Sequence, residues 1–329
     1  MLCDDENQPE TLAMEYFQSG VEKFLDGMQE MAKADFLLAI EFDPTITLAY
    51  CYLSSIYTED NDPDAGIALC KQGLEFDSEN PHLHFCLGVA YDMKGMKWEA
   101  IEEYEFYSLS YSDDAECKFS IGCAYDDLGK KDLARESYKE AVNIDVYHHR
   151  SYFNWALVEG EDGEMEKAIQ LLQRAVEINA DYWKAWVKLG IFQSKEKNIE
   201  EAIDAYSHAV KLNPELGDVY YNLGISYKIT KQPAKAVEAF KQVISLDPED
   251  ANGWHNLGIN YYDIKKYDDA VEALQTAIML NLHHEEAHYR LGCIYATTGE
   301  LEKAQKEVSF LKTVNEEYSI AIKELIEQA

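Results

Sequence analysis

The chain has 329 residues, of which 47% are apolar and 28% charged, and it contains 17 glycines and 7 prolines. This composition excludes collagen-like and proline-rich disordered classes and predicts a folded protein. The formal net charge of −33 repels phosphate backbones and anionic membrane surfaces. We therefore expect proteins as partners, and neither nucleic acid nor membrane.

The N-terminus and the cysteines bear on where the protein works. The first ten residues, MLCDDENQPE, are acidic where a secretion signal is basic, and the chain has no run of about 18 apolar residues. Seven cysteines, at positions 3, 51, 70, 86, 117, 123 and 293, form no CxxC pair. Such scattered cysteines are typical of reduced thiols. We expect a cytoplasmic protein without disulfides.

The sequence repeats with a period of 34 residues. The segment Tyr220-x2-Leu223-Gly224-x2-Tyr227 aligns without a gap with Trp254-x2-Leu257-Gly258-x2-Tyr261. The same frame predicts nine repeats over residues 13–318, which start at 13, 47, 81, 115, 149, 183, 217, 251 and 285. Residues 1–12 then form an acidic N-terminal extension, and residues 319–329 form the end of a C-terminal capping helix.

Each repeat has the pattern of two short amphipathic helices. Apolar residues at positions 4, 7, 8 and 11 and at positions 20, 24 and 27 follow helical spacing. Small residues at positions 8 and 20 let two helices approach closely, and glycine at position 15 of five repeats indicates the turn. One such pair cannot bury its apolar face alone, so the pairs must stack on one another.

This pattern resembles the tetratricopeptide repeat (TPR) family, whose 34-residue unit carries W-x2-L-G-x2-Y, A-x3-F and P. The resemblance implies an all-α fold: a right-handed α-solenoid of nine 34-residue helix pairs with a C-terminal capping helix. It implies that the first helices line a concave groove. It also implies a scaffold or adaptor that holds an extended peptide or a helix of a partner protein in that groove.

Catalytic chemistry has little support in the sequence. The chain has no GxSxG, HExxH, Walker or dinucleotide-binding motif. The nearest metal-binding pattern is His284-x3-His288, but His288 occupies core position 4, where packing is the simpler explanation. We therefore predict a protein that is not an enzyme and that has no cofactor or bound metal.

Position 6 carries polar side chains in the second half of the chain. Repeats 5 to 9 have Asn154, Lys188, Asn222, Asn256 and Arg290 there, on the helix face away from the core positions. An asparagine amide both donates and accepts, so a row of them can pair with an extended peptide backbone. The three asparagines are similar to the asparagine ladder of O-linked N-acetylglucosamine transferases. The alternative is a merely solvated polar position.

Basic residues gather at the same predicted groove. We expect the following to face inward and to hold an acidic segment or a free C-terminal carboxylate: Arg150, Lys184, Lys188, Lys195, Lys228 and Arg290. The alternative is that these cations balance nearby carboxylates such as Glu159, Glu161 and Asp218.

Part of this set resembles the carboxylate clamp of TPR co-chaperones, which bind the acidic C-terminal tails of heat-shock chaperones. Asn154, Lys184 and Lys188 match clamp positions, whereas Phe119 and Cys123 replace the lysine and asparagine of its first repeat. A cytosolic chaperone or co-chaperone for secreted or heat-shock clients is therefore the alternative function.

Repeat 1 differs because its predicted groove face is apolar. Met14, Phe17, Val21 and Phe24 follow helical spacing there. An exposed apolar stripe indicates an interface, either with a partner or with a second copy of the chain. The alternative is that residues 1–12 cover the stripe.

Overall fold

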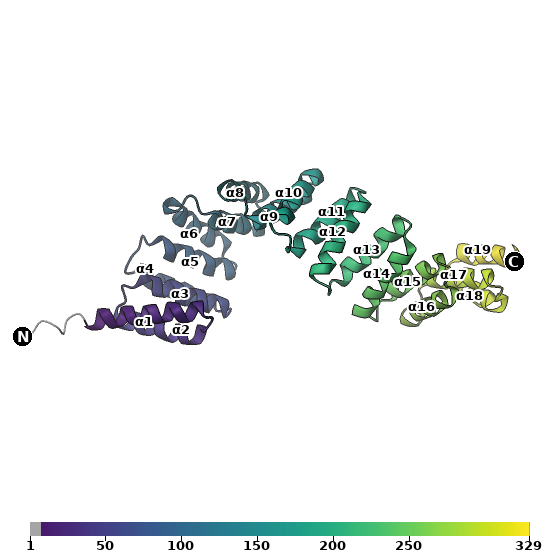
Figure 1. Cartoon of the computed structure of the whole chain (residues 1–329), viewed down its shortest axis with the longest axis horizontal. Coiled ribbons are helices and arrows are strands. Elements are labelled where there is room, and N and C mark those ends of the chain that lie inside the picture. Colours follow the sequence, from purple (N-terminus) through teal and green to yellow (C-terminus); the bar gives the residue numbers. More distant parts are fainter. Residues whose placement is uncertain (1–7, 329) are drawn as a thin grey trace, which may run out of the picture. The chain divides into compact units, whose positions relative to one another are not determined.

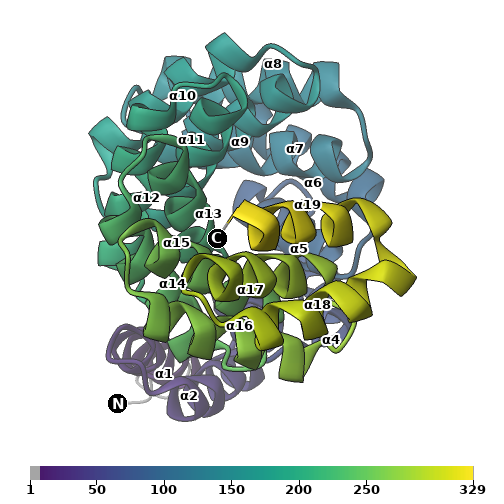
Figure 2. The same cartoon turned by 90° about the vertical axis from the view of Figure 1, so that its right-hand side faces the viewer.

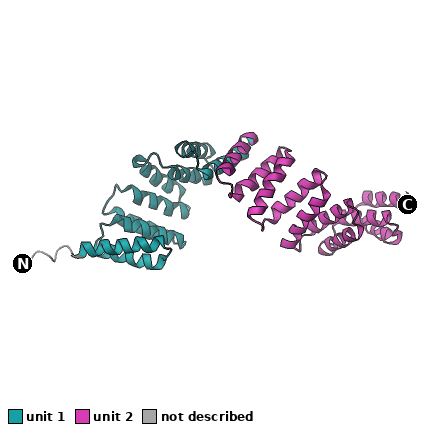
Figure 3. Ribbon diagram, viewed as in Figure 1, with its two compact units in different colours: residues 1–164 teal, residues 165–329 magenta. Residues whose placement is uncertain are grey.

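The structure is a computed structural model that describes residues 8–328, and within that range it contains nineteen helices and no strand (Figure 1). The chain divides into two compact units, residues 1–164 and 165–329 (Figure 3). The helices of unit 1 are α1 (Gln8–Leu25), α2 (Gln29–Phe42), α3 (Thr47–Glu59), α4 (Pro63–Leu74), α5 (Pro81–Met93), α6 (Lys97–Ser110), α7 (Ala115–Asp127), α8 (Lys131–Ile144) and α9 (His149–Glu161). Those of unit 2 are α10 (Met165–Ile178), α11 (Trp183–Lys195), α12 (Ile199–Leu212), α13 (Gly217–Ile229), α14 (Pro233–Leu246), α15 (Ala251–Asp263), α16 (Tyr267–Leu280), α17 (Glu285–Thr297), α18 (Leu301–Val314) and α19 (Glu316–Gln328).

The helix boundaries follow the 34-residue frame. In repeats 2 to 9 the first helix begins at the first residue of the repeat. α1 begins earlier, at Gln8, inside the segment predicted as an N-terminal extension. Residues 1–7 of that extension, and residue 329, lie outside the described part of the chain. The two helices of repeat 5, α9 and α10, belong to different units.

A left-handed residue at position 15 ends the first helix of every repeat. The five predicted glycines have φ between 68° and 86°, while repeats 2, 6, 7 and 8 place Asn61, Lys197, Lys231 and Lys265 there with φ of 56° to 65°. The following amide bonds back to the carbonyl at position 11, as from Lys130 N to Tyr125 O at 2.8 Å. This hydrogen bond is the Schellman closure of a helix end, which confirms the predicted turn.

Within a repeat, the small residue at position 8 makes room for the bulky residue at position 24. A Cβ atom added at Gly122 would lie 2.6 Å from Tyr138 Cε1, and one at Gly224 would lie 2.7 Å from Phe240 Cζ. Tyr138 and Phe240 are both fully buried. The glycine therefore lets the second helix press its largest core side chain against the backbone of the first helix.

The last helix, α19, caps unit 2 as predicted. Figure 2 shows α19 beside α17, and Tyr318 of α19 stacks on Tyr289 of α17 with ring centroids 4.4 Å apart. Ile322 is fully buried, with its Cδ1 atom where a Cβ at Gly292 would be only 2.5 Å away. Ile322 thus fills the place beside Gly292 that a position-24 side chain fills in the other repeats with glycine at position 8.

We expect Gly224→Ala to lower the free energy of unfolding by about 1–3 kcal/mol, since the added methyl group overpacks the site against Phe240. Urea denaturation followed by circular dichroism measures the change. The control is Gly217→Ala at the start of the same helix, where the nearest atom to an added Cβ is 3.9 Å away. Equal denaturation midpoints for the two variants would contradict this account of position 8.

Candidate functional site: the first-helix face of unit 2

The candidate site is the surface of unit 2 that carries positions 2, 6, 9, 12 and 13 of α11, α13, α15 and α17. We call it the first-helix face of unit 2. Position 9 supplies an apolar row, Ile191, Ile225, Ile259 and Cys293, in which every side chain is buried or half-buried. Position 6 supplies the neighbouring row, Lys188, Asn222, Asn256 and Arg290. A polar row therefore runs beside an apolar row.

Two of the predicted binding residues, Arg150 and Asn154, lie in α9 of unit 1 and make internal contacts. Arg150 Nη1 donates to Glu116 Oε1 at 2.8 Å, and its guanidinium lies 4.3 Å from the ring centroid of Phe119. Asn154 Nδ2 donates to Cys123 Sγ at 3.3 Å and to the Tyr138 hydroxyl at 3.4 Å. The structure thus assigns packing partners to both residues.

The lysines of the first-helix face have no such partners. Lys184, Lys188, Lys195 and Lys228 form no ion pair and no hydrogen bond from Nζ to any described residue. Lys184 Nζ only approaches the Trp183 ring, at 5.7 Å from its centroid, and Lys195 Nζ lies 5.6 Å from that of Phe192. The face therefore presents ammonium groups that form no ion pair with a carboxylate of residues 8–328.

Two of the carboxylates suggested as counter-ions are engaged within unit 1. Glu159 is 2% exposed and accepts a hydrogen bond from Arg135 Nε at 3.0 Å. Glu161 pairs with Lys131, with Nζ and Oε2 2.8 Å apart.

The asparagines at position 6 differ in their freedom to bind. The Asn222 side chain is half-buried and makes no hydrogen bond to a described residue. Asn256 is only 6% exposed, and its Nδ2 donates to the Tyr221 hydroxyl at 3.0 Å and to Asn252 O at 2.9 Å. The Asn222 amide therefore has no partner within residues 8–328, whereas the Asn256 amide forms a hydrogen bond that links α15 to α13.

Arg290 in α17 lines a small pocket on the same face. The pocket measures about 180 Å³, and its other lining residues are Ile259, Tyr262, Asp263, Leu274, Cys293, Ile294, Thr297 and Leu325. Leu325 comes from the capping helix α19, which closes one wall. Arg290 Nε is buried and has no hydrogen-bond partner in the described chain, while Nη2 lies 3.9 Å from Glu286 Oε1.

His255 of α15 and His284, the N-cap residue of α17, form a ring contact, with centroids 4.5 Å apart. His284 Nδ1 accepts the backbone N–H of Ala287 at 3.3 Å, so in the neutral ring the proton sits on Nε2. The Nε2 atoms of both rings are buried without partners among residues 8–328. Burial, helped by the charges of His284, Lys228 and Arg290, lowers the pKa of His255 to about 3.

The histidines of the predicted metal pattern serve other purposes. His288 Nδ1 lies 2.6 Å from Glu307 Oε2, and its ring stacks on Phe310. His284 caps α17 and contacts His255. No group of three or more metal-binding side chains comes together in the described residues.

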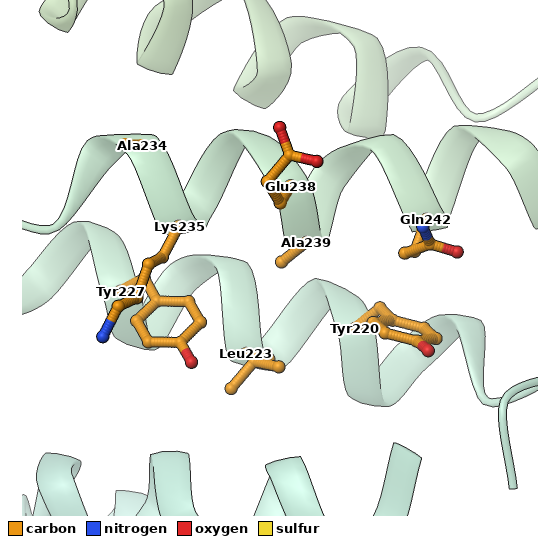
Figure 4. Close-up of a pocket in the computed structure, with 8 residues that line it drawn as sticks. All are labelled: Tyr220, Leu223, Tyr227, Ala234, Lys235, Glu238, Ala239 and Gln242. Atoms are coloured by element: carbon orange, nitrogen blue, oxygen red, sulfur yellow. The ribbon is translucent and has the colours of Figure 1, made fainter. Parts of the chain in front are cut away.

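A larger pocket, of about 500 Å³, lies on repeat 7 (Figure 4). Tyr220, Leu223 and Tyr227 of α13 line it together with residues of α14, among them Lys235 and Glu238. Lys235 Nζ lies 5.4 Å from the centroid of the Tyr227 ring. None of the binding residues predicted from the sequence lines this pocket, which offers aromatic and aliphatic contact with exposed charges at its edge.

The apolar stripe of repeat 1 is largely packed against its own unit. Phe24 and Phe17 contact the Tyr52 ring, with centroids 5.2 Å and 6.1 Å apart. Phe17, Val21 and Phe24 adjoin the buried cluster around Phe36, and all three are half-buried. Of the four stripe residues only Met14 is exposed, at 45%.

Comparisons with known proteins identify the fold and the family. A family model described as the tetratricopeptide repeat protein 21 C-terminal ARM domain matches residues 130–252, and two tetratricopeptide repeat models match residues 227–281 and 285–308. No curated protein matches the chain. Helix pairs with a 34-residue period define the class of α-solenoids. The chain belongs to the tetratricopeptide repeat family.

Solved structures share this fold at low identity. The C-terminal part of a TPR repeat-containing protein from Cytophaga hutchinsonii is 15% identical over 72% of this chain and 97% of its own, with a TM-score of 0.61. A tetratricopeptide repeat protein from Parabacteroides merdae is 16% identical over 74% and 97%, with a TM-score of 0.50. YrrB, described as a TPR protein with an unusual peptide-binding site, is 19% identical over 57% and 96%, with a TM-score of 0.52. These identities show the fold alone.

Sequence reasoning missed two parts of the site. It did not single out His255, although position 5 is phenylalanine in four other repeats, Phe17, Phe85, Phe119 and Phe153. The sequence analysis compared position 6 between repeats but not position 9. The apolar residues at position 9 include Ile259 and Cys293, which line the smaller pocket. The same comparison between repeats, applied to every position, would have found both signals.

We expect His255→Phe to make stability less sensitive to acid. In the unfolded chain His255 is protonated below about pH 6.5, whereas in the folded protein burial lowers its pKa to about 3. Because the unfolded state binds this proton first, wild-type stability falls as the pH drops from about 6.5 to about 3. Between pH 7 and pH 5 the variant should lose up to about 2 kcal/mol less than wild type. Urea denaturation at both pH values measures this, with His283→Gln, an exposed neighbour, as the control. The same loss in wild type and His255→Phe would refute the assignment.

Proposed function

We propose that the protein is a non-enzymatic adaptor that binds an extended acidic segment of a partner protein along the first-helix face of unit 2. Tetratricopeptide repeats are generally interaction modules, and at that level the chain is a protein-interaction scaffold. The observation that carries the finer proposal is the set of lysines on this face that lack carboxylate partners. In a chain with a net charge of −33, free ammonium groups favour an anionic ligand.

The neighbouring side chains support an extended peptide rather than a small ion. The unpaired amide of Asn222 can both donate to and accept from a peptide backbone. The apolar row at position 9 can contact aliphatic side chains of the same segment. The solved structure of YrrB, whose description names a peptide-binding site, belongs to a protein of the same fold.

The cytoplasm is the compartment we propose for this adaptor. The six described cysteines are free thiols, as a reducing compartment would keep them. Among residues 8–328, no helix has the length and apolar character needed to cross a bilayer. The stripe of repeat 1 leaves little open apolar surface for an unfolded client, so we prefer an adaptor to a chaperone.

We expect Lys184→Glu combined with Lys188→Glu to abolish most binding of acidic peptides and to flatten the dependence of binding on salt. An array of acidic and neutral peptides probed with purified protein at low and high salt measures both effects. Lys306→Glu combined with Lys312→Glu, on α18, makes the same change in net charge away from the face and should bind like wild type. An equal loss of peptide binding in both double variants would show a general effect of net charge and would contradict the proposed site on the first-helix face.

We expect Asn222→Ala to weaken a bound peptide by about 1 kcal/mol, through loss of hydrogen bonds to its backbone. Isothermal titration calorimetry with a peptide selected from the array gives the affinity. Asn256→Ala is unsuitable as a probe of binding because Asn256 joins α13 to α15 and its loss should lower stability. If the Asn222→Ala variant binds the peptide with unchanged affinity, the side chain at position 6 does not pair with the peptide backbone.

A further inference from the structure

The outward face of α6, the second helix of repeat 3, carries an unusual line of side chains. Trp98, Glu102, Glu105 and Leu109 occupy positions 18, 22, 25 and 29 of the repeat, and all four are exposed. We call this line the α6 ridge. Position 18 is acidic in seven of the other eight repeats, where it lies in the first turn of the second helix and interacts favourably with the helix dipole. In repeat 3 a tryptophan replaces this acid.

Two large apolar side chains lie open to solvent at the two ends of the α6 ridge. Trp98 is 51% exposed, and the other four tryptophans of the chain, all within the described residues, are half-buried. The ring of Tyr125 in α7 stands edge-on to Trp98, with centroids 6.3 Å apart. Leu109 is 82% exposed, the highest value for a large apolar side chain in the described part of the chain. An exposed tryptophan and leucine on one line of a helix indicate an interface.

The two glutamates between them have no basic partner among the described residues. The three lysines between positions 81 and 127 form ion pairs with other carboxylates: Lys94 with Asp64, Lys97 with Asp92 and Asp127, and Lys118 with Glu140. Glu105 accepts a hydrogen bond from the Tyr125 hydroxyl, with the oxygens 3.5 Å apart, and Glu102 forms no ion pair or hydrogen bond with a described residue. Because like charges three residues apart destabilise a helix, cations from a partner would stabilise this pair.

The spacing of the α6 ridge fits a second helix. Residues 98, 102, 105 and 109 follow the four-three-four spacing with which two packed helices meet. At a rise of 1.5 Å per residue, the line from Trp98 to Leu109 is about 16 Å long, or about three helical turns. A partner helix that lies along α6 would therefore place apolar residues at the two ends of this line and basic residues at its two inner positions.

We propose that the α6 ridge binds a basic amphipathic helix of a partner protein, with arginines or lysines opposite Glu102 and Glu105 and apolar side chains against Trp98 and Leu109. An arginine over the indole of Trp98 adds a cation–π contact. Charge favours this occupant over a second copy of the chain, because residues 1–148 contain 32 acidic and 10 basic side chains and two such segments repel each other. The α6 ridge belongs to unit 1, so this inference does not rest on the function proposed for unit 2.

The probes are three synthetic helical peptides. The first has the core Leu-Ala-Ala-Ala-Arg-Ala-Ala-Arg-Ala-Ala-Ala-Leu between two Ala-Gln-Ala-Ala flanks, and the others replace both arginines by glutamine or by glutamate. Fluorescence anisotropy of labelled peptides gives the affinities for the full chain. We expect the arginine peptide to bind about tenfold more tightly than the glutamine peptide. Equal binding of these two peptides, or no binding of the arginine peptide, would overturn the proposal.

Trp98 shows where the peptide binds. Because it is the exposed tryptophan, acrylamide quenches its fluorescence in preference to that of the half-buried four. The peptides contain no tryptophan, so saturation with unlabelled arginine peptide should lower the quenching of the protein, and the Trp98→Phe variant should show no such change. Binding of the arginine peptide without a fall in quenching would place it elsewhere and overturn the proposal.

A charge swap tests the two glutamates. Glu102→Lys combined with Glu105→Lys should lose the arginine peptide and gain binding of the glutamate peptide, again with a fall in the quenching of Trp98. Glu200→Lys combined with Asp204→Lys makes the same change in net charge on α12 and should bind the arginine peptide like wild type; circular dichroism checks that both variants fold. Equal loss of the arginine peptide in both double variants would overturn the site. A dimer in analytical ultracentrifugation that Leu109→Ser dissociates would show a second copy on the α6 ridge and would overturn the proposed partner.

Discussion

The close approach of two helices at position 8 is the contact on which each repeat depends. Glycine at this position lets Tyr138 or Phe240 lie against the backbone of the preceding helix, fully buried. Because most pairs are built on this contact, the same positions of the first helix point outward in repeat after repeat. The order of the first-helix face of unit 2 is thus a consequence of packing on its opposite side.

An outward-facing polar side chain is available to a ligand only where the protein does not already pair it with a neighbouring group. Arg150, Asn154 and Asn256 have side chains of the expected type, but each is held by a neighbour within its unit. Lys188 and Asn222 occupy the same position 6 and have no such partner in the part of the chain that the structure describes. A polar side chain already satisfied inside the protein gains little from a ligand, since binding would exchange one hydrogen bond for another.

Most of the fold could be predicted from the sequence because the 34-residue period repeats the same steric requirements nine times. The turn at position 15 was predicted only from its glycines. The structure extends it to Asn61, a residue type that tolerates the left-handed conformation, and to three lysines, whose side chains give no local signal of it. The site was less predictable. Whether Asn256 meets Tyr221, or His255 meets the N-cap residue His284 of α17, depends on how neighbouring first helices pack, which position numbers alone do not encode.

The left-handed lysines of repeats 6, 7 and 8 are positions where a single substitution can make unit 2 more stable. An L-residue in this conformation costs roughly 1–2 kcal/mol, a cost that glycine avoids. Lys197, Lys231 and Lys265 therefore mark three consecutive turns where replacement by glycine relieves backbone strain without altering any residue of the first-helix face. Destabilising substitutions on that face can therefore be offset at these turns during evolution or in engineering.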